Sequence, residues 1–150
     1  MNGTYTFFKK VACIVVLIGC SASGFAQSVR VSDDDLYAVA SFQYMIIHDF
    51  YVVSCARKHG FYYTTLGNRF IDRYGKFFAE QEAKALRVLQ SLGYPFEDFA
   101  DATVKYPRQL LSHEFCSNLG SALLARVEDV KVVERGIETQ RQALMPAFQR

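Results

Sequence analysis

Apolar residues recur at spacings of three and four along most of the chain after residue 30, which is the pattern of amphipathic α-helices. The first such face consists of Leu36, Val39, Phe42, Ile46, Phe50 and Val53. Ser32 and the three aspartates after it predict where this helix begins, because a hydroxyl caps free N–H groups and acids favour the positive end of the helix dipole. Gly60 predicts its end. Further apolar residues widen the face, so we expect burial on more than one side.

A second long helix is expected to follow a turn over residues 60–65. Its apolar positions begin at Leu66 and continue until Gly93 and Pro95 stop the chain. Two helices of similar length joined by a short turn are typical of an antiparallel pair.

The remaining residues predict a short third helix and a long fourth one. The third, residues 96–106, is expected to end before Pro107, because proline disfavours a helical conformation in the preceding residue. The fourth runs from about Arg108 and is longer than a bundle needs, so we expect it to break near Gly136 or to project. Residues 138–150 are then a candidate arm or dimer contact. The pattern therefore predicts an all-α fold, an up-down-up-down four-helix bundle with a short third helix.

The first 26 residues have the organisation of a bacterial export signal. Lys9 and Lys10 precede an apolar run over residues 11–18, and small residues follow. The run is well short of the ~18 residues that cross a bilayer as a helix. No second apolar stretch is evident downstream, so we expect no stable membrane span.

Two cleavage sites compete in this segment. Leu-Ile-Gly-Cys at 17–20 resembles a lipobox, which would cut between residues 19 and 20 and place a lipid on Cys20. Gly-Phe-Ala at 24–26 resembles an ordinary signal-peptidase site, which would cut between residues 26 and 27. The expected location is periplasmic or secreted, tethered to a membrane only if Cys20 is acylated, with residues 27–150 as a single helical domain.

Cys55 and Cys116 remain as a pair once the signal is removed. An even pair in an oxidising compartment predicts a disulfide, and the alternative is two buried thiols. In the predicted bundle the end of the first helix and the beginning of the last one meet, so a Cys55–Cys116 bridge fits the topology. Closing this loop would stabilise the fold by about 4 kcal/mol in the entropic model.

Charge argues against nucleic acid as a partner. The chain has 150 residues with 17 Lys plus Arg and 15 Asp plus Glu. The signal holds two lysines and no acid, so the remainder has 17 − 2 = 15 basic and 15 acidic residues and no net charge. Nucleic-acid binding needs a basic excess or stripe.

The chemistry-bearing residues form no catalytic, metal or cofactor motif. His48, His59 and His113 lie in no recognised ligand spacing. His48 and Asp49 are adjacent on a helix and point about 100° apart, so we interpret them as a polar edge rather than an acid–base pair. We therefore expect a non-enzymatic protein without metal or cofactor.

One surface is uneven in charge and rich in aromatic residues. It surrounds the expected turn between the first two helices and comprises Arg57, Lys58, His59, Phe61, Tyr62, Tyr63, Arg69, Arg73 and Lys76. Tyrosine and arginine dominate protein-binding hot spots, so this is the candidate partner surface. The alternative is a solvated helix face whose aromatic residues fold back on the core.

The aromatic load raises the alternative of an internal pocket for an apolar ligand. Seven rings fall on inward-facing stripes, namely Phe42, Phe50, Phe70, Tyr74, Phe77, Phe78 and Phe115. Rings at helical spacing more often fill a core, especially in a small protein without tryptophan.

These features favour a small exported protein of a Gram-negative envelope that binds another protein, as an inhibitor or immunity factor does. The layout of one cysteine ending the first helix and one in the last is similar to amidase-immunity proteins of the type VI secretion system. That similarity covers architecture only and transfers no functional residue. The alternatives are a periplasmic carrier of a lipid or other apolar ligand, and a structural lipoprotein that forms homodimers through its last helix.

Overall fold

The computed structural model describes residues 31–148, which form five helices and no strand. They are α2 (Asp33–His59), α3 (Phe61–Ser91), α4 (Phe96–Leu110), α5 (His113–Glu128) and α6 (Val130–Phe148). The all-α prediction is confirmed. The export signal, Cys20 and both cleavage sites lie outside the described residues.

Both predicted ends of α2 are confirmed, and their chemistry is visible. The Ser32 hydroxyl accepts a hydrogen bond from the backbone N–H of Asp35 at 3.1 Å. Gly60 ends the helix with φ of 94°, a conformation that residues with a side chain rarely adopt. The expected turn over residues 60–65 is wrong, because this one glycine reverses the chain and α3 begins at Phe61.

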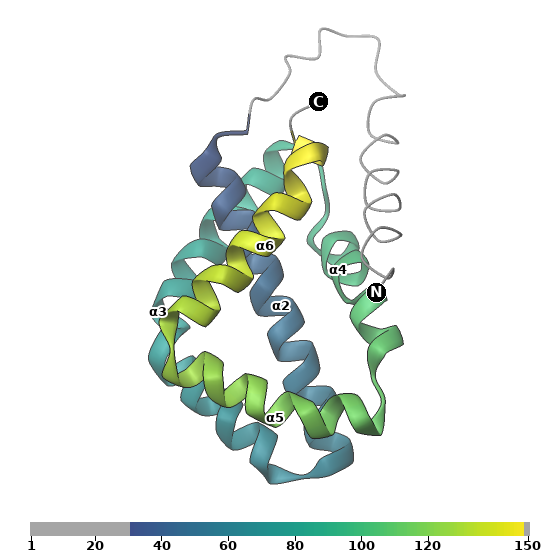
Figure 1. Cartoon of the computed structure of the whole chain (residues 1–150). Helices are drawn as coiled ribbons and strands as arrows, with labels where there is room; N and C mark the ends of the chain where they lie inside the picture. The colour runs from purple at the N-terminus through teal and green to yellow at the C-terminus, as the bar shows by residue number, and fades with distance from the viewer. Residues whose placement is uncertain (1–30, 149–150) are drawn as a thin grey trace, which may run out of the picture.

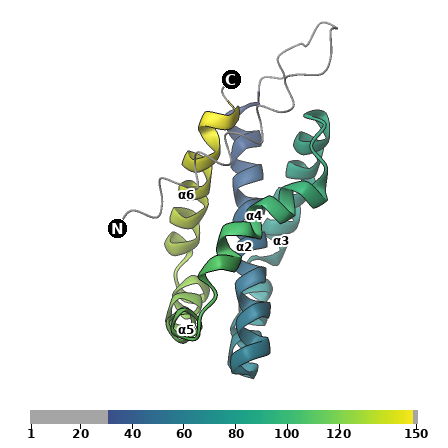
Figure 2. The same ribbon diagram turned by 90° about the vertical axis from the view of Figure 1, so that its right-hand side faces the viewer.

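Helix α2 is the centre of the fold. Figure 2 shows it between α3 and α6, with α4 crossing in front, and it packs against all three. Every residue from 38 to 44 is buried, so the expected burial on more than one side is confirmed.

The apolar character of α2 has a second consequence. Over Asp33–Arg57 it is the one described helix long and apolar enough to cross a membrane by length and composition, whereas no apolar stretch of this kind was expected after the signal. In this fold, 61% of that apolar window is buried inside the molecule. Such burial is what the core helix of a folded domain requires.

Helix α4 continues beyond its predicted end. Pro107 lies inside it, is buried, and is followed by three more helical residues. A proline removes one backbone hydrogen bond but does not by itself terminate a helix. The helix ends only where Leu111 becomes extended and Ser112 caps the next helix by accepting from the N–H of Phe115 at 3.0 Å.

The predicted fourth helix is two helices, α5 and α6. They separate at Asp129, whose backbone is extended and whose carboxylate accepts from the N–H of Lys131 at 2.9 Å. The break expected near Gly136 is wrong. Gly136 lies inside α6 against Tyr44, where an added Cβ would come within 2.3 Å of the tyrosine ring.

Because the predicted fourth helix is divided into α5 and α6, the arrangement of helices differs from the expected up-down-up-down bundle. Figure 1 shows α5 lying across the long helices at their lower end, whereas α6 runs up along α2. Ile137 and Leu144 of α6 are buried in the core that it forms with α2 and α3. The residues of the expected free arm that the structure describes, 138–148, therefore belong to α6, and Leu144 among them is part of this core.

Two hydrophobic clusters share α2 and α3. The larger includes Phe42, Phe70 and Phe78 together with buried residues of α6. The smaller surrounds Cys55 and Cys116 and includes buried residues of α5. The predicted disulfide joins Cys55 to Cys116 with their Cα atoms 5.6 Å apart. It fastens the beginning of α5 to the end of α2, as expected.

Candidate functional site

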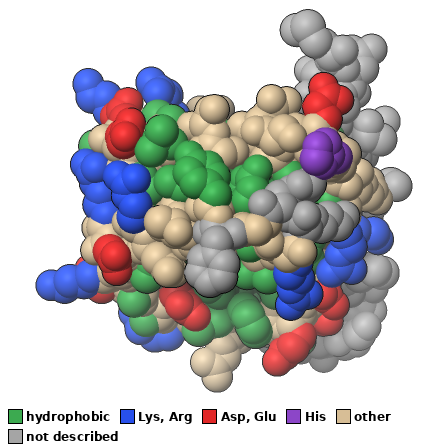
Figure 3. Space-filling view, turned by 90° about the horizontal axis from the view of Figure 1, so that it is seen from below, with side chains coloured by type: hydrophobic (Ala, Val, Ile, Leu, Met, Phe, Trp, Pro, Cys, Tyr) green, Lys and Arg blue, Asp and Glu red, His purple; other side chains and the backbone are tan. Residues whose placement is uncertain are grey.

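The α2–α3 turn and α5 form one end of the molecule, which we call the hairpin end and define by Arg57, Tyr62 and Arg69. Figure 3 views this end from below and shows hydrophobic side chains in its middle with Lys and Arg side chains around its edges. Arg57 and Arg69 are exposed. The side chains of Lys58, His59 and Phe61, also predicted for this surface, lie outside what the structure describes.

The two tyrosines in the first turn of α3 face different ways. The Tyr63 hydroxyl donates to the backbone oxygen of Cys116, and its side chain is buried next to the disulfide. Tyr62 is 55% exposed and lies beside Gly120 of α5, where an added Cβ would be 3.1 Å from the ring. Only Tyr62 of this pair offers an aromatic surface to a partner.

The three cations predicted for this surface on α3, Arg69, Arg73 and Lys76, also differ in their contacts. Arg73 donates to the backbone oxygens of Val127 and Glu128, the last carbonyls of α5, and its guanidinium lies 5.4 Å from the Tyr74 ring centre. It holds the end of α5 and is therefore a structural residue. Lys76 is exposed, further along α3 from the turn.

The positive charge of the hairpin end is not neutralised within the described part of the chain. Arg57, Arg69 and Lys76 form no ion pair with any carboxylate there. This leaves their charge available to an acidic partner.

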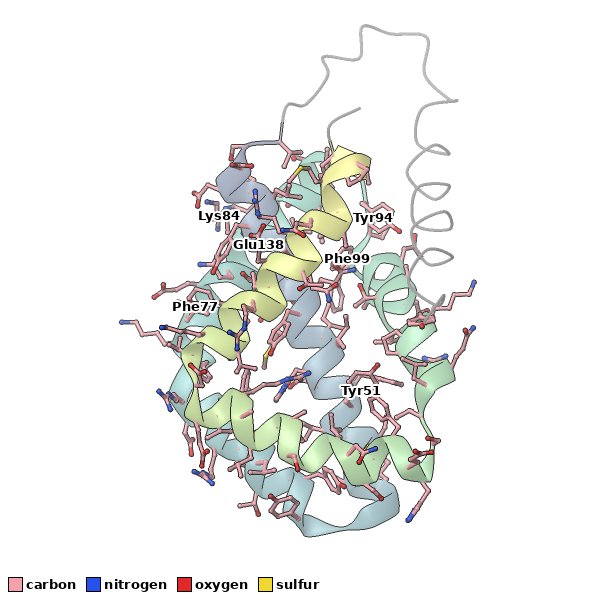
Figure 4. The ribbon with its side chains drawn as sticks, in the orientation of Figure 1. Tyr51, Phe77, Lys84, Tyr94, Phe99 and Glu138 are labelled. Atoms are coloured by element: carbon pink, nitrogen blue, oxygen red, sulfur yellow. A yellow bond between two sulfur atoms is a disulfide. The ribbon has the colours of Figure 1, made fainter. Side chains whose placement is uncertain are left out.

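Cations are paired at the opposite end. Arg141 of α6 contacts Asp33 at 3.1 Å and Glu138 at 2.8 Å, and Lys84 of α3 contacts Asp34. Figure 4 shows Lys84 and Glu138 close to this upper end. These contacts neutralise part of the acidic charge at the beginning of α2.

The aromatic stripes fill the core. Phe42, Phe70, Tyr74 and Phe78 are buried, and the other three rings are partly buried. Their ring centres lie close together, 5.6 Å apart for Phe70 and Phe78 and 5.0 Å for Phe77 and Phe78. Packing of this kind is that of a close-packed interior.

A second site lies inside the molecule, and we call Tyr44, His48, Tyr74 and Arg126 the polar layer. His48 is buried, stacks on Phe70 at 3.9 Å and has its Nδ1 3.3 Å from a guanidinium nitrogen of Arg126. The same guanidinium lies over the Tyr44 ring at 5.4 Å. Burial, and then the nearby Arg126 charge, lower the pKa of His48 to about 3.

This site is not among those predicted from the sequence. The expectation that His48 forms a polar edge is wrong, because His48 lies four residues after buried Tyr44 on an inward face. That i, i+4 spacing is a signal in the sequence. Arg126 is 78 residues away and carries no local signal, so only the fold brings it to His48.

The described residues contain no group of three or more His, Cys, Asp or Glu side chains that could hold a metal ion. What the chain offers instead is an exposed basic-aromatic end and a buried set of hydrogen-bond donors. Comparison with models of known protein families, with curated proteins and with solved structures finds no match.

Proposed function

We propose that this chain is a small exported protein of a Gram-negative envelope that acts without catalysis, by binding another protein through the hairpin end. The observation that carries the proposal is the exposed ring of Tyr62 on a surface whose cations, Arg57 and Arg69, have no ion-pair partner among the described residues. Aromatic and arginine side chains together are enriched in binding hot spots. The partner surface is therefore acidic with an apolar site for the tyrosine ring, as an inhibited or neutralised enzyme could present.

Export is proposed from the sequence of residues 1–26, and the mature protein is periplasmic or secreted. Its intact mass, measured on protein from the envelope of its source organism, tests this. A mass beginning at Gln27 indicates ordinary cleavage, and one beginning at Cys20 with added acyl chains indicates a lipoprotein. The full unprocessed mass would contradict export.

The partner is tested by replacing Tyr62 with a photo-crosslinking amino acid in the full chain, expressed in the source organism. Illumination of the envelope should yield one discrete crosslinked species. The same residue placed at Gln90, which is exposed on α3 far from the turn, is the positional control.

Charge reversal then separates specific from incidental crosslinking. Arg57→Glu with Arg69→Glu should reduce the crosslinked species at least tenfold, because both cations would repel an acidic partner. Arg87→Glu with Arg135→Glu changes the net charge equally at exposed positions elsewhere and should leave it unchanged. Circular dichroism checks that all variants fold, and survival of the species in the first variant would refute binding through the hairpin end.

A further inference from the structure

The Cys55–Cys116 disulfide is attached to the same part of α5 that supports Tyr62. Cys116 lies in the first turn of α5, and Gly120 follows one turn later. Residues four apart on a helix share one face, so Cys116 and Gly120 lie on the same side of α5. Both are buried. The disulfide therefore fixes this side of α5 against the end of α2.

Tyr62 packs on that side of α5. An added Cβ at Gly120 would lie 3.1 Å from the Tyr62 ring, so the ring is in close contact with the backbone of the glycine. The next residue, Tyr63, turns inward and donates from its hydroxyl to the backbone oxygen of Cys116. The start of α3 thus contacts two consecutive turns of α5. The position of these turns determines how the Tyr62 ring is presented to a partner.

The far end of α5 has attachments of its own. Arg73 donates to the last carbonyls of α5, and a guanidinium nitrogen of Arg126 lies 3.3 Å from the Nδ1 of His48. The covalent bond, by contrast, is made at the beginning of the helix, through Cys116. Loss of the disulfide should therefore act first on the beginning of α5 and on the Tyr62 surface beside it.

The disulfide is shielded in the folded protein, because Cys55 and Cys116 are both fully buried. Thiol–disulfide exchange requires the attacking sulfur to reach its target. The bond must therefore form before α5 is packed in place. In the proposed export route both cysteines leave the cytosol as thiols, because that compartment keeps thiols reduced.

We infer that the Cys55–Cys116 disulfide is a latch that completes the hairpin end only after export. The oxidant is a thiol–disulfide oxidoreductase of the envelope. Its disulfide breaks, the Cys55–Cys116 bond forms, and two electrons and two protons pass to its two sulfurs. In the reduced chain the beginning of α5 does not support Tyr62, so the chain does not bind its partner before export. This gating rests on the proposed function, whereas the latch is measurable without a partner.

Two glycines report on the latch by NMR, because the ring current of a tyrosine shifts the Hα signals of a glycine packed against it. Gly120 contacts Tyr62 at the hairpin end. Gly136 contacts Tyr44, a residue of the larger apolar cluster. One spectrum of the processed protein therefore shows both regions, and the second glycine is an internal control for the first.

Cys55→Ala with Cys116→Ala removes the latch without leaving thiols. In this variant the Gly120 signals should move to the positions of an unpacked glycine, and those of Gly136 should stay in place. The unmodified protein reduced with dithiothreitol is the second measurement and should give the same result. Tyr63→Phe keeps the disulfide and removes the hydrogen bond to Cys116, so it is the matched control and should leave both glycines packed.

Photo-crosslinking from position 62 then tests the link to binding. At equal amounts of protein in the envelope, the double alanine variant should yield at least tenfold less of the crosslinked species than the chain with both cysteines. If neither chain yields a crosslinked species, the proposed partner binding fails, and the Gly120 signals alone decide whether the disulfide is a latch.

Three results would overturn the inference. Unchanged Gly120 signals without the disulfide would show that the surface forms in the reduced chain. Loss of the Gly136 signals together with those of Gly120, complete unfolding included, would show that the disulfide holds the whole domain rather than the hairpin end. An undiminished crosslinked species from the double alanine variant would show that binding does not depend on the latch.

Discussion

Single residues in this protein take their roles from what the fold places beside them. Arg69 and Arg73 lie one turn apart on the same helix and look equivalent in the sequence. One is exposed without an ion-pair partner in the described chain, and the other holds the last carbonyls of α5. His48 and Asp49 are neighbours in the chain, yet His48 is buried and Asp49 is exposed.

At this scale we predict that acid destabilises the protein through His48. Its folded pKa of about 3 lies below the usual 6.5, so the unfolded state binds the proton first. The stability is fully present above pH 6.5 and is lost as pH falls towards 3, by about 1.4 kcal/mol for each unit. Urea unfolding between pH 4 and 7.5 measures this slope.

His48→Gln keeps an acceptor for Arg126 and removes the titrating ring, so its unfolding free energy should depend less steeply on pH.

The contribution of Asp49 to the pH dependence of stability has the opposite sign. Although Asp49 as a residue is exposed, neighbouring side chains partly desolvate its carboxyl, and this desolvation and then repulsion by Glu82 raise its pKa to about 6. Screening by solvent reduces the effect on stability. Because Asp49 is present in both proteins, its contribution cancels in their difference. Parallel pH profiles would contradict the role of His48.

The ends of a helix were predicted correctly where local chemistry determines them. They were predicted poorly where contacts with distant residues determine them. The beginning of α2 and the reversal at Gly60 follow from a hydroxyl cap and a glycine, both readable in the sequence. Where α5 separates from α6, the last carbonyls of α5 accept from Arg73, which lies about fifty residues earlier. No local pattern reports such a contact, so the break was expected at the wrong residue.

The corresponding prediction concerns the end of α5. Arg73→Gln removes charged hydrogen bonds to the carbonyls of Val127 and Glu128, so it should lower the free energy of unfolding by about 1–2 kcal/mol. Arg69→Gln, the matched change one turn away at an exposed position, should stay within about 0.5 kcal/mol. Urea unfolding compares the two variants, and equal effects would show that Arg73 does not stabilise this junction.

At the scale of the whole molecule, two apolar clusters share the long helices, and the disulfide belongs to the smaller one. That cluster contains Cys55, Leu66, Cys116 and Leu123, and it joins α5 to α2 and α3. The larger cluster joins α2, α3 and α6. Unequal clusters of this kind permit one end to open while the other stays folded.

Reduction of the disulfide should therefore act mainly on α5. The closed loop of 61 residues predicts a loss of about 4 kcal/mol in the entropic model. Amide hydrogen exchange of the reduced protein should show lost protection in α5 and retained protection in α2 and α6. Uniform loss across all the helices would contradict a separate opening of this end.

The sequence by itself determined the helical class, the limits of α2 and the pairing of Cys55 with Cys116. Those features follow from the spacing of apolar residues, from the capping residues at the ends of α2 and from the number of cysteines. All three can be found in the sequence without knowledge of long-range contacts. Only the tertiary structure decided that α5 crosses the long helices, that Tyr63 turns inward while Tyr62 stays exposed, and that Arg126 reaches His48. Each of these depends on a contact between residues at least fifty positions apart, so it has no periodic signal in the chain.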